Sequence, residues 1–252
     1  VERFLSGVLL EADGSTSNAF TLLLARMFAL GVPGLPADGM QALPALLAAP
    51  IAQRIELNRR VTGMARDGQS WVVTDGEGTV RARHVVVATD PRTAAALTGA
   101  PPPTMKGVVT DWWAADAVPS GPAMLWVDGR PKMAGPVVNT AIISKAAPSY
   151  APPGRHLIAA SALLGSDRSP PAEAVTRAHA ADILGADATG WSPVVRHIVT
   201  DALPAQPPPL RVRRPVRTPE GLWVCGDHRD TASIQGALVS GRRVAEAIAR
   251  EA

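Results

Sequence analysis

The segment GDHRDTASIQGALVSGRR, residues 226–243, constrains the fold more than any other stretch of this chain. It follows the short apolar run Leu222–Cys225, which predicts a strand, and it leads into small and apolar side chains at helical spacing. A strand that passes directly into a helix places unpaired backbone N–H groups and a partial positive charge at the strand end. Anionic ligands commonly bind there on α/β sheets.

The residue types in this segment suit such a ligand. Gly226, Gly236 and Gly241 carry no Cβ, so a bulky group could approach the backbone closely. Asp227 could accept hydrogen bonds from sugar or polyol hydroxyls, and His228 after it is expected to be a solvated loop residue. The alternative is a strand–loop–helix whose small residues serve only tight packing. The spacing matches neither a P-loop nor a dinucleotide fingerprint.

Composition narrows the function classes. Of 252 residues, 46% are hydrophobic and 4% aromatic, which fits an α/β chain with a sizeable core. The densest basic run, RVRRPVR at 211–217, is either a phosphate or nucleic-acid patch or a solvated segment. No aromatic residue interrupts it, so no nucleic-acid partner is expected. Cys225 is the single cysteine and no His/Cys cluster accompanies it, so neither an internal disulfide nor a metal site is expected.

No apolar stretch reaches membrane-spanning length, since Arg26 interrupts the longest one. No secretory signal pattern is present, so we expect a cytoplasmic protein. The sequence starts at Val1 without an initiator Met, which suggests a fragment, a processed chain or a piece of a larger protein.

Periodicity predicts both helices and strands along the chain. Helices are expected over 16–30, 41–51 and 170–185. Two-residue alternation from Ile55 to Val61 predicts a strand, and an Asp-Gly turn at 75–76 predicts a hairpin. The apolar run Val85–Val87 is typical of a parallel strand buried on both faces. Further strands are expected at 107–116, 123–129, 137–144, 155–163 and 195–204.

The segment LWVCGDHRDTASIQGALVSGRRVAEAI, residues 222–248, resembles the C-terminal flavin-binding motif of FAD-dependent amine oxidases and phytoene-desaturase-like oxidoreductases. LPADGMQALPALLA at 35–48 and the stretch 55–91 resemble other segments of the same superfamily, in the same order. The resemblance implies FAD as cofactor and an α/β (mixed α+β) fold, with a partial Rossmann-like FAD-binding domain and a mixed-sheet substrate domain. The FAD-contacting residues that it implies are Val61, Gly226, Asp227, Ser233, Ile234, Gly236 and Ala237.

The resemblance also implies a division of the chain into two domains. Residues 31–98 and 203–252 would form a discontinuous, incomplete FAD-binding domain, and residues 1–30 and 99–202 the substrate domain. The family's N-terminal GxGxxG strand–turn–helix is not found in this sequence. We therefore expect a Rossmann-containing partner polypeptide, either a separate subunit or a cleaved N-terminal half, that completes the FAD site in a heteromer.

The implied chemistry is oxidation or desaturation of a C–H bond by hydride transfer to flavin N5, on a small-molecule substrate that could be an apolar polyene or an amine. Amine oxidases place a lysine near N5, and Lys106 precedes a predicted substrate-domain strand, so Lys106 is the catalytic candidate. A surface lysine at a strand start is the alternative reading. A non-catalytic binding or chaperone-like protein that keeps the flavoenzyme fold remains the alternative function.

Overall fold

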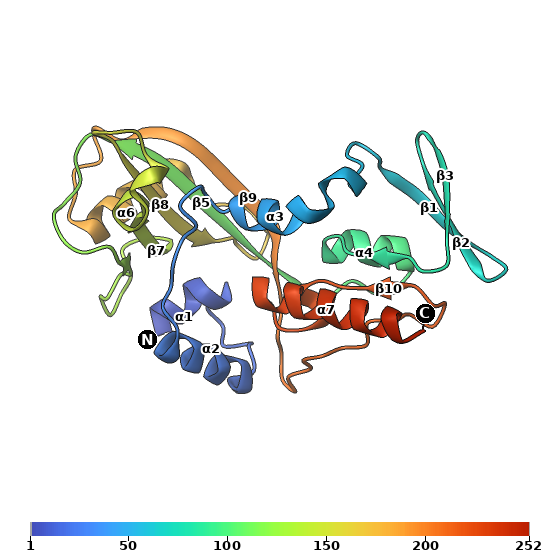
Figure 1. Ribbon diagram of the computed structural model, residues 1–252. Helices are drawn as coiled ribbons and strands as arrows, with labels where there is room; N and C mark the ends of the chain where they lie inside the picture. The colour runs from blue at the N-terminus through green and yellow to red at the C-terminus, as the bar shows by residue number, and fades with distance from the viewer. Residues whose placement is uncertain (1, 252) are drawn as a thin grey trace. The chain divides into compact units, whose positions relative to one another are not determined.

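The computed structural model describes residues 2–251, which form two compact units (Figure 1). The first unit comprises the chain up to Ser15, Thr21–Pro50 and Met105–Ala202. The second comprises Thr16–Phe20, Ile51–Thr104 and the chain from Leu203 onward. Val1 and Ala252, the outer limits of the expected domains, lie outside the described residues. Helices and several sheets are mixed along the chain, as the predicted α/β (mixed α+β) class requires, and no described helix has the length and apolar character needed to cross a membrane.

A five-stranded sheet forms the centre of the first unit, in the order β6-β7-β8-β5-β9. Its strands are β5 (Met105–Ala115), β6 (Leu125–Trp126), β7 (Val137–Ile142), β8 (His156–Leu163) and β9 (Ser192–Pro204). Strand β5 alternates buried and half-buried residues along its whole length, as a strand with one face on the core does. All five strands fall within or around the ranges that the sequence predicts.

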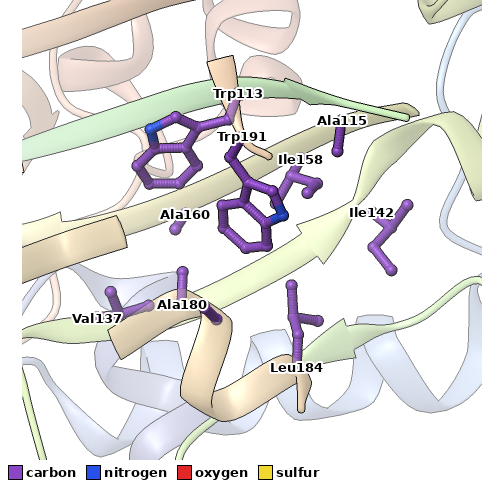
Figure 2. Close-up of a cluster of buried hydrophobic side chains, with 10 residues drawn as sticks. Trp113, Ala115, Val137, Ile142, Ile158, Ala160, Ala180, Leu184 and Trp191 are labelled. Atoms are coloured by element: carbon purple, nitrogen blue, oxygen red, sulfur yellow. The ribbon is translucent and has the colours of Figure 1, made fainter. Parts of the chain in front are cut away.

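The main core lies between this sheet and α6 (Glu173–Leu184), as Figure 2 shows. The rings of Trp113 and Trp191 face each other there with centroids 5.5 Å apart, and the Trp113 indole N–H donates to Glu173 at 2.7 Å. Other buried side chains of this core include Val137 of β7, Ile158 of β8 and Ala180 of α6.

Helix α1 (Glu2–Leu9) packs near β7, and the sequence analysis did not predict it. Helix α2 (Asn18–Leu30) matches its prediction, and its Phe28 ring contacts Phe4 of α1 edge-on, with centroids 5.1 Å apart. The first unit also holds α3 (Ala42–Ala48), the short α5 (Ile143–Ala146) and the 3-10 turn η2 (Pro148–Tyr150).

The segment 31–50, which the sequence analysis assigned to the FAD-binding domain, belongs to the first unit in the structure. The Ser149 hydroxyl donates a hydrogen bond to the Ala37 carbonyl at 2.5 Å and so joins this segment to η2. A hydrogen bond between residues more than a hundred positions apart cannot be predicted from the local sequence of either segment. Which unit binds FAD stays a prediction.

The second unit contains an antiparallel three-stranded sheet of β1 (Val61–Asp67), β2 (Ser70–Asp75) and β3 (Gly78–Ala82). The predicted Asp-Gly hairpin is confirmed, and Asp75 accepts the backbone N–H groups of Glu77 and Gly78 in its turn. The predicted strand from Ile55 is wrong, because η1 (Ala49–Arg54) and irregular backbone precede Val61. The partner strand β2 ends opposite Val61, so the alternating residues before it have no ladder to join.

Strands β4 (Val86–Val87) and β10 (Trp223–Val224) form a parallel pair in the second unit, although 135 residues separate them. This confirms that the two apolar runs share one sheet. Val87 and Val224 are buried, whereas Val86 is 42% exposed, so the expected cover on both faces is not provided within residues 2–251. Helix α4 (Pro91–Thr98) follows β4, and η3 (Asp227–Arg229) and α7 (Ile234–Glu251) follow β10.

Candidate functional site

The loop between β10 and α7 gathers most of the predicted site residues. Gly226 leaves the strand with φ +145°, a conformation that favours glycine. The fully buried Ser240 hydroxyl accepts the Gly226 N–H at 2.8 Å and lies 2.9 Å from the Gly226 carbonyl oxygen. The middle of α7 is thereby fixed to the end of β10, which holds the intervening loop in a closed geometry.

The start of α7 is built around Ser233 and Gly236. The Ser233 hydroxyl accepts the Gly236 N–H at 3.0 Å, as a helix cap does. A Cβ at position 236 would lie 1.8 Å from the Thr231 carbonyl oxygen. The close approach of the Thr231 carbonyl therefore requires glycine at position 236, whether or not a ligand binds there.

Asp227 is half-buried at the first position of η3. Burial raises the pKa of its carboxyl, while the neighbouring backbone N–H of His228 opposes the rise. Ala237 is half-buried on α7, and Ile234 is 56% exposed. The loop therefore presents an acceptor carboxylate, a helix start and an exposed apolar side chain within a short stretch of backbone.

Arg243 ties this loop to the basic segment before β10. Its guanidinium forms an ion pair with Asp230 at 3.1 Å and donates to the carbonyl oxygens of Arg229 and Arg214 at 3.1 and 2.8 Å. The loop after Gly226 is thus connected to α7 by both Ser240 and Arg243, which makes it a preorganised element rather than a loose connection.

Val61, the predicted adenine contact, lines a cavity of about 630 Å³ elsewhere in the second unit. The cavity wall is mainly apolar, with Met64 of β1, Val86 of β4 and Leu97 of α4 among its members, and Arg59 lies at it as well. Its size and apolar lining suit a flat ring system. The register at Val61 is irregular, because a bulge separates it from Gly63.

His228 corrects one expectation of the sequence analysis. Instead of being a solvated loop residue, it is 6% exposed, and its ring lies beside Gly226. A Cβ at Gly226 would lie 2.7 Å from ring atoms of His228, so the glycine makes room for the imidazole. The sequence signal for this burial was only the position directly after Asp227.

Lys106, the catalytic candidate, lies near the start of β5 in the first unit. Its ammonium group forms an ion pair with Glu11 and donates to the Leu9 carbonyl at 3.2 Å. Both side chains of the pair are largely buried, at 12% and 8% exposure. This arrangement connects β5 to the chain after α1, so a structural role accounts for Lys106, and a role at the flavin stays a prediction.

The model of the family described as flavin containing amine oxidoreductase matches residues 1–249. No protein among the curated ones matches the sequence.

Solved structures share the fold at low sequence identity. An oxidoreductase from Methanosarcina mazei is 15% identical with a TM-score of 0.78, and the match covers 97% of this chain and 63% of that one. A redesigned putrescine oxidase is 16% identical with a TM-score of 0.60, covering 84% and 53%. A reduced UDP-galactopyranose mutase is 8% identical with a TM-score of 0.57, covering 81% and 52%. The chain thus spans between about half and two thirds of the length of these structures.

Proposed function

Because this chain belongs to the family of flavin containing amine oxidoreductases, we propose that it contributes part of an FAD-dependent oxidoreductase that oxidises or desaturates a C–H bond of an organic substrate. When bound, FAD supplies the chemistry by accepting a hydride at N5. The mutase among the structural neighbours shows that this fold also occurs in enzymes that catalyse other reactions. The proposal therefore rests on the residues of the site and not on the fold.

The observation that supports the proposal most is the half-buried Asp227 beside the start of α7. Its carboxylate is partly desolvated, which raises its pKa and makes hydrogen bonds from ligand hydroxyls valuable. We propose that Asp227 accepts hydrogen bonds from the ribityl or pyrophosphate region of FAD. Gly226, Ser233, Ile234, Gly236 and Ala237 would shape the surface against which the flavin lies.

The adenine end would use Val61. We propose that the backbone of Val61 contacts the adenine and that the apolar cavity beside it receives the ring. These residues fit the two ends of FAD, but a second group of backbone N–H donors for the pyrophosphate, such as a GxGxxG turn provides, is not found in the sequence.

A partner polypeptide would supply the missing turn. Strand β4 pairs with β10 along one edge only within residues 2–251, so its other edge is open to a further parallel strand. Val86 on β4 and Ile234 and Leu238 on α7 are exposed large apolar residues of the same unit. An open strand edge beside exposed apolar side chains is what a covering Rossmann-type unit would bury. Residence of this assembly in the cytoplasm stays a prediction of the sequence.

Flavin retention tests the proposal. The chain would be purified together with any co-purifying polypeptide, and flavin absorbance and chromatography would identify and quantify the cofactor. Asp227→Ala should weaken FAD binding about 5- to 150-fold, since a lost buried hydrogen-bond acceptor costs about 1–3 kcal/mol. Asp116→Ala is the matched control, because Asp116 is an exposed carboxylate of the first unit. Equal FAD retention in both variants would contradict the assignment.

The alternative is a non-catalytic binding or chaperone-like protein with the same fold. The observation that favours it is the engagement of Lys106 by Glu11, which leaves the catalytic candidate with a structural role. Absence of flavin from every purified form, including the complex with a Rossmann-containing partner, would favour this alternative. Intact-mass analysis of all chains in the sample would identify such a partner, and a monomer that holds stoichiometric FAD alone would contradict the partner proposal.

A further inference from the structure

A second cavity of the second unit has features that the flavin proposal does not use. It has a volume of about 340 Å³ and is lined by Arg214, His228 and Arg229, by residues of α4 and by the segment 100–103. We call it the arginine pocket. A neighbouring hollow of about 510 Å³ is lined by the basic segment 211–215 and again by Arg229, so Arg214 and Arg229 belong to both.

Three buried side-chain nitrogens of the arginine pocket, on His228 and Arg229, have no hydrogen-bond partner within residues 2–251. His228 is 6% exposed, and neither of its ring nitrogens has a hydrogen-bond partner. The Nε of Arg229 is likewise buried and unpartnered, and its Nη1 makes only a long contact of 3.4 Å with the Pro215 carbonyl. Buried donors of this kind are normally satisfied, so their number in one cavity calls for a ligand.

Carboxylates do not balance these cations. Within residues 2–251, neither Arg214 nor Arg229 forms an ion pair. Asp90 is the acidic residue that acts on His228, but its Oδ1 accepts the backbone N–H groups of Arg92 and Thr93. Burial lowers the pKa of Arg229, and the charge of Arg214 lowers it further. Two neighbouring guanidinium groups thus share a partly desolvated site without an anion.

We propose that the arginine pocket binds a phosphate-class oxyanion, held by the guanidinium groups of Arg214 and Arg229 and by a ring N–H of His228. A guanidinium group can donate two parallel hydrogen bonds to two oxygens of a phosphate. An anion here would also offset the free-energy cost of the buried positive charge. Burial lowers the pKa of His228 to about 4, so the ring is a neutral donor at pH 7.

The volume and the apolar lining of the arginine pocket indicate which kind of phosphate it suits. A single phosphate fills only part of about 340 Å³, and the rest of the lining is apolar, with Ala94 of α4 and Pro101–Pro103. The pocket therefore suits a phosphate that carries an organic group. That phosphate belongs either to the cofactor or to a separate phosphorylated small molecule, and the two share the same chemistry at the arginines.

Calorimetric titration with inorganic phosphate and with pyrophosphate tests the proposal on the purified chain with its co-purifying partners. Arg214→Gln and Arg229→Gln should each weaken binding about 10-fold or more, and Arg214→Lys should weaken it less because it keeps the charge. Arg242→Gln is the control, since Arg242 is 71% exposed on α7 and should leave binding unchanged. The ¹⁵N resonances of His228 should shift on phosphate addition.

Two forms of the protein distinguish the sources of the phosphate. Binding in the flavin-free form alone assigns the pocket to a phosphate of the cofactor, and binding in both forms assigns it to a separate phosphorylated ligand. No phosphate binding in either form, or equal weakening by Arg242→Gln, overturns the proposal. If Arg229→Gln does not fold, Arg214→Gln and the His228 resonances decide. The titration of the flavin-free form needs no flavin, so its outcome is separate from that of the flavin proposal.

Discussion

The hydroxyl of Ser240 lies 2.8 Å from the backbone nitrogen of Gly226 and 2.9 Å from its carbonyl oxygen. One fully buried side chain of α7 thus contacts both backbone groups of Gly226, which follows β10, and the Gly226 carbonyl also accepts the Arg229 N–H at 3.0 Å. This contact determines the path of the loop that carries Asp227, and therefore the geometry of the proposed flavin site.

Ser240→Ala removes both contacts and leaves the Gly226 N–H without its acceptor, while the Gly226 carbonyl keeps the hydrogen bond from the Arg229 N–H at 3.0 Å. We expect a loss of about 1–3 kcal/mol in the free energy of unfolding, because a desolvated N–H loses its partner. Urea denaturation measures this loss. Ser120→Ala, at an exposed serine of the first unit, is the control and should change stability little. A loss of similar size in both variants would show that the Ser240 contact is not special.

Gly236→Ala and Gly241→Ala form a matched pair on the same helix. A Cβ at 236 would lie 1.8 Å from the Thr231 carbonyl oxygen, whereas no atom lies within 4 Å of a Cβ at 241. Gly236→Ala should therefore destabilise the protein, and Gly241→Ala should stabilise it by about 0.5–1 kcal/mol, as alanine does inside a helix. Thermal unfolding compares them, and equal melting temperatures would refute the distinction.

The stability of the protein should fall in acid partly because of His228. Burial lowers its pKa to about 4 from the ordinary 6.5, so protonation favours the unfolded chain. The contribution is fully present above pH 6.5 and is lost as the pH falls toward 4, by up to about 3 kcal/mol. His228→Gln should lose less stability than the parent chain between pH 7 and pH 4. Parallel urea curves at both pH values measure this, and identical losses would contradict the burial of a neutral ring.

Asp128 is expected to stabilise the first unit. Its carboxylate accepts two hydrogen bonds from Arg130 at 2.8 and 2.9 Å and one from His179 Nε2 at 3.0 Å, since the Nδ1 of His179 accepts the Val137 N–H. Its side chain is 1% exposed. Asp128→Ala should cost about 3–5 kcal/mol, because it leaves a buried network without its anion.

The network of Asp128 also sets a pH dependence. Hydrogen bonds from Arg130 hold the pKa of Asp128 well below its usual range, so its contribution is present above pH 3.8 and is lost as the pH falls through the lowered pKa. We expect Asp128 to stay charged in the folded state at both pH 7 and pH 3. Denaturation at the two pH values measures its contribution to stability. Asp116→Ala, at an exposed ion pair with Arg155, is the control and should change stability by less than about 1 kcal/mol.

Lys106 allows a direct test of its two roles. If the pair with Glu11 is its function, Lys106→Met and Glu11→Gln should destabilise the protein to a similar extent, because each removes the same largely buried ion pair. If Lys106 acts at the flavin, Lys106→Met should lower the rate of flavin reduction at unchanged FAD occupancy, while Glu11→Gln should not. Unfolding and rapid-mixing kinetics on the same two variants separate these outcomes.

Local patterns identified the elements around the motif correctly. The Asp75-Gly76 turn, the apolar runs of β4 and β10, and the small-residue helix after Gly226 all follow from neighbouring residues, because turn chemistry and side-chain period act over a few positions. The false strand before Val61 has the same origin. Alternation favours an extended chain, but only a partner strand can complete its hydrogen bonds.

The sequence by itself determined the α/β class and the strand–loop–helix that carries Asp227, since both depend on short-range periodicity and on residues adjacent in the chain. Only the tertiary structure decided that His228 is buried, that Glu11 engages Lys106, and that Gly236 is required by a carbonyl of its own loop. The first two depend on packing by other segments and the third on a close backbone approach. Burial, charge pairing and steric closure are properties of groups brought together by the fold, and the order of residues along the chain does not specify them.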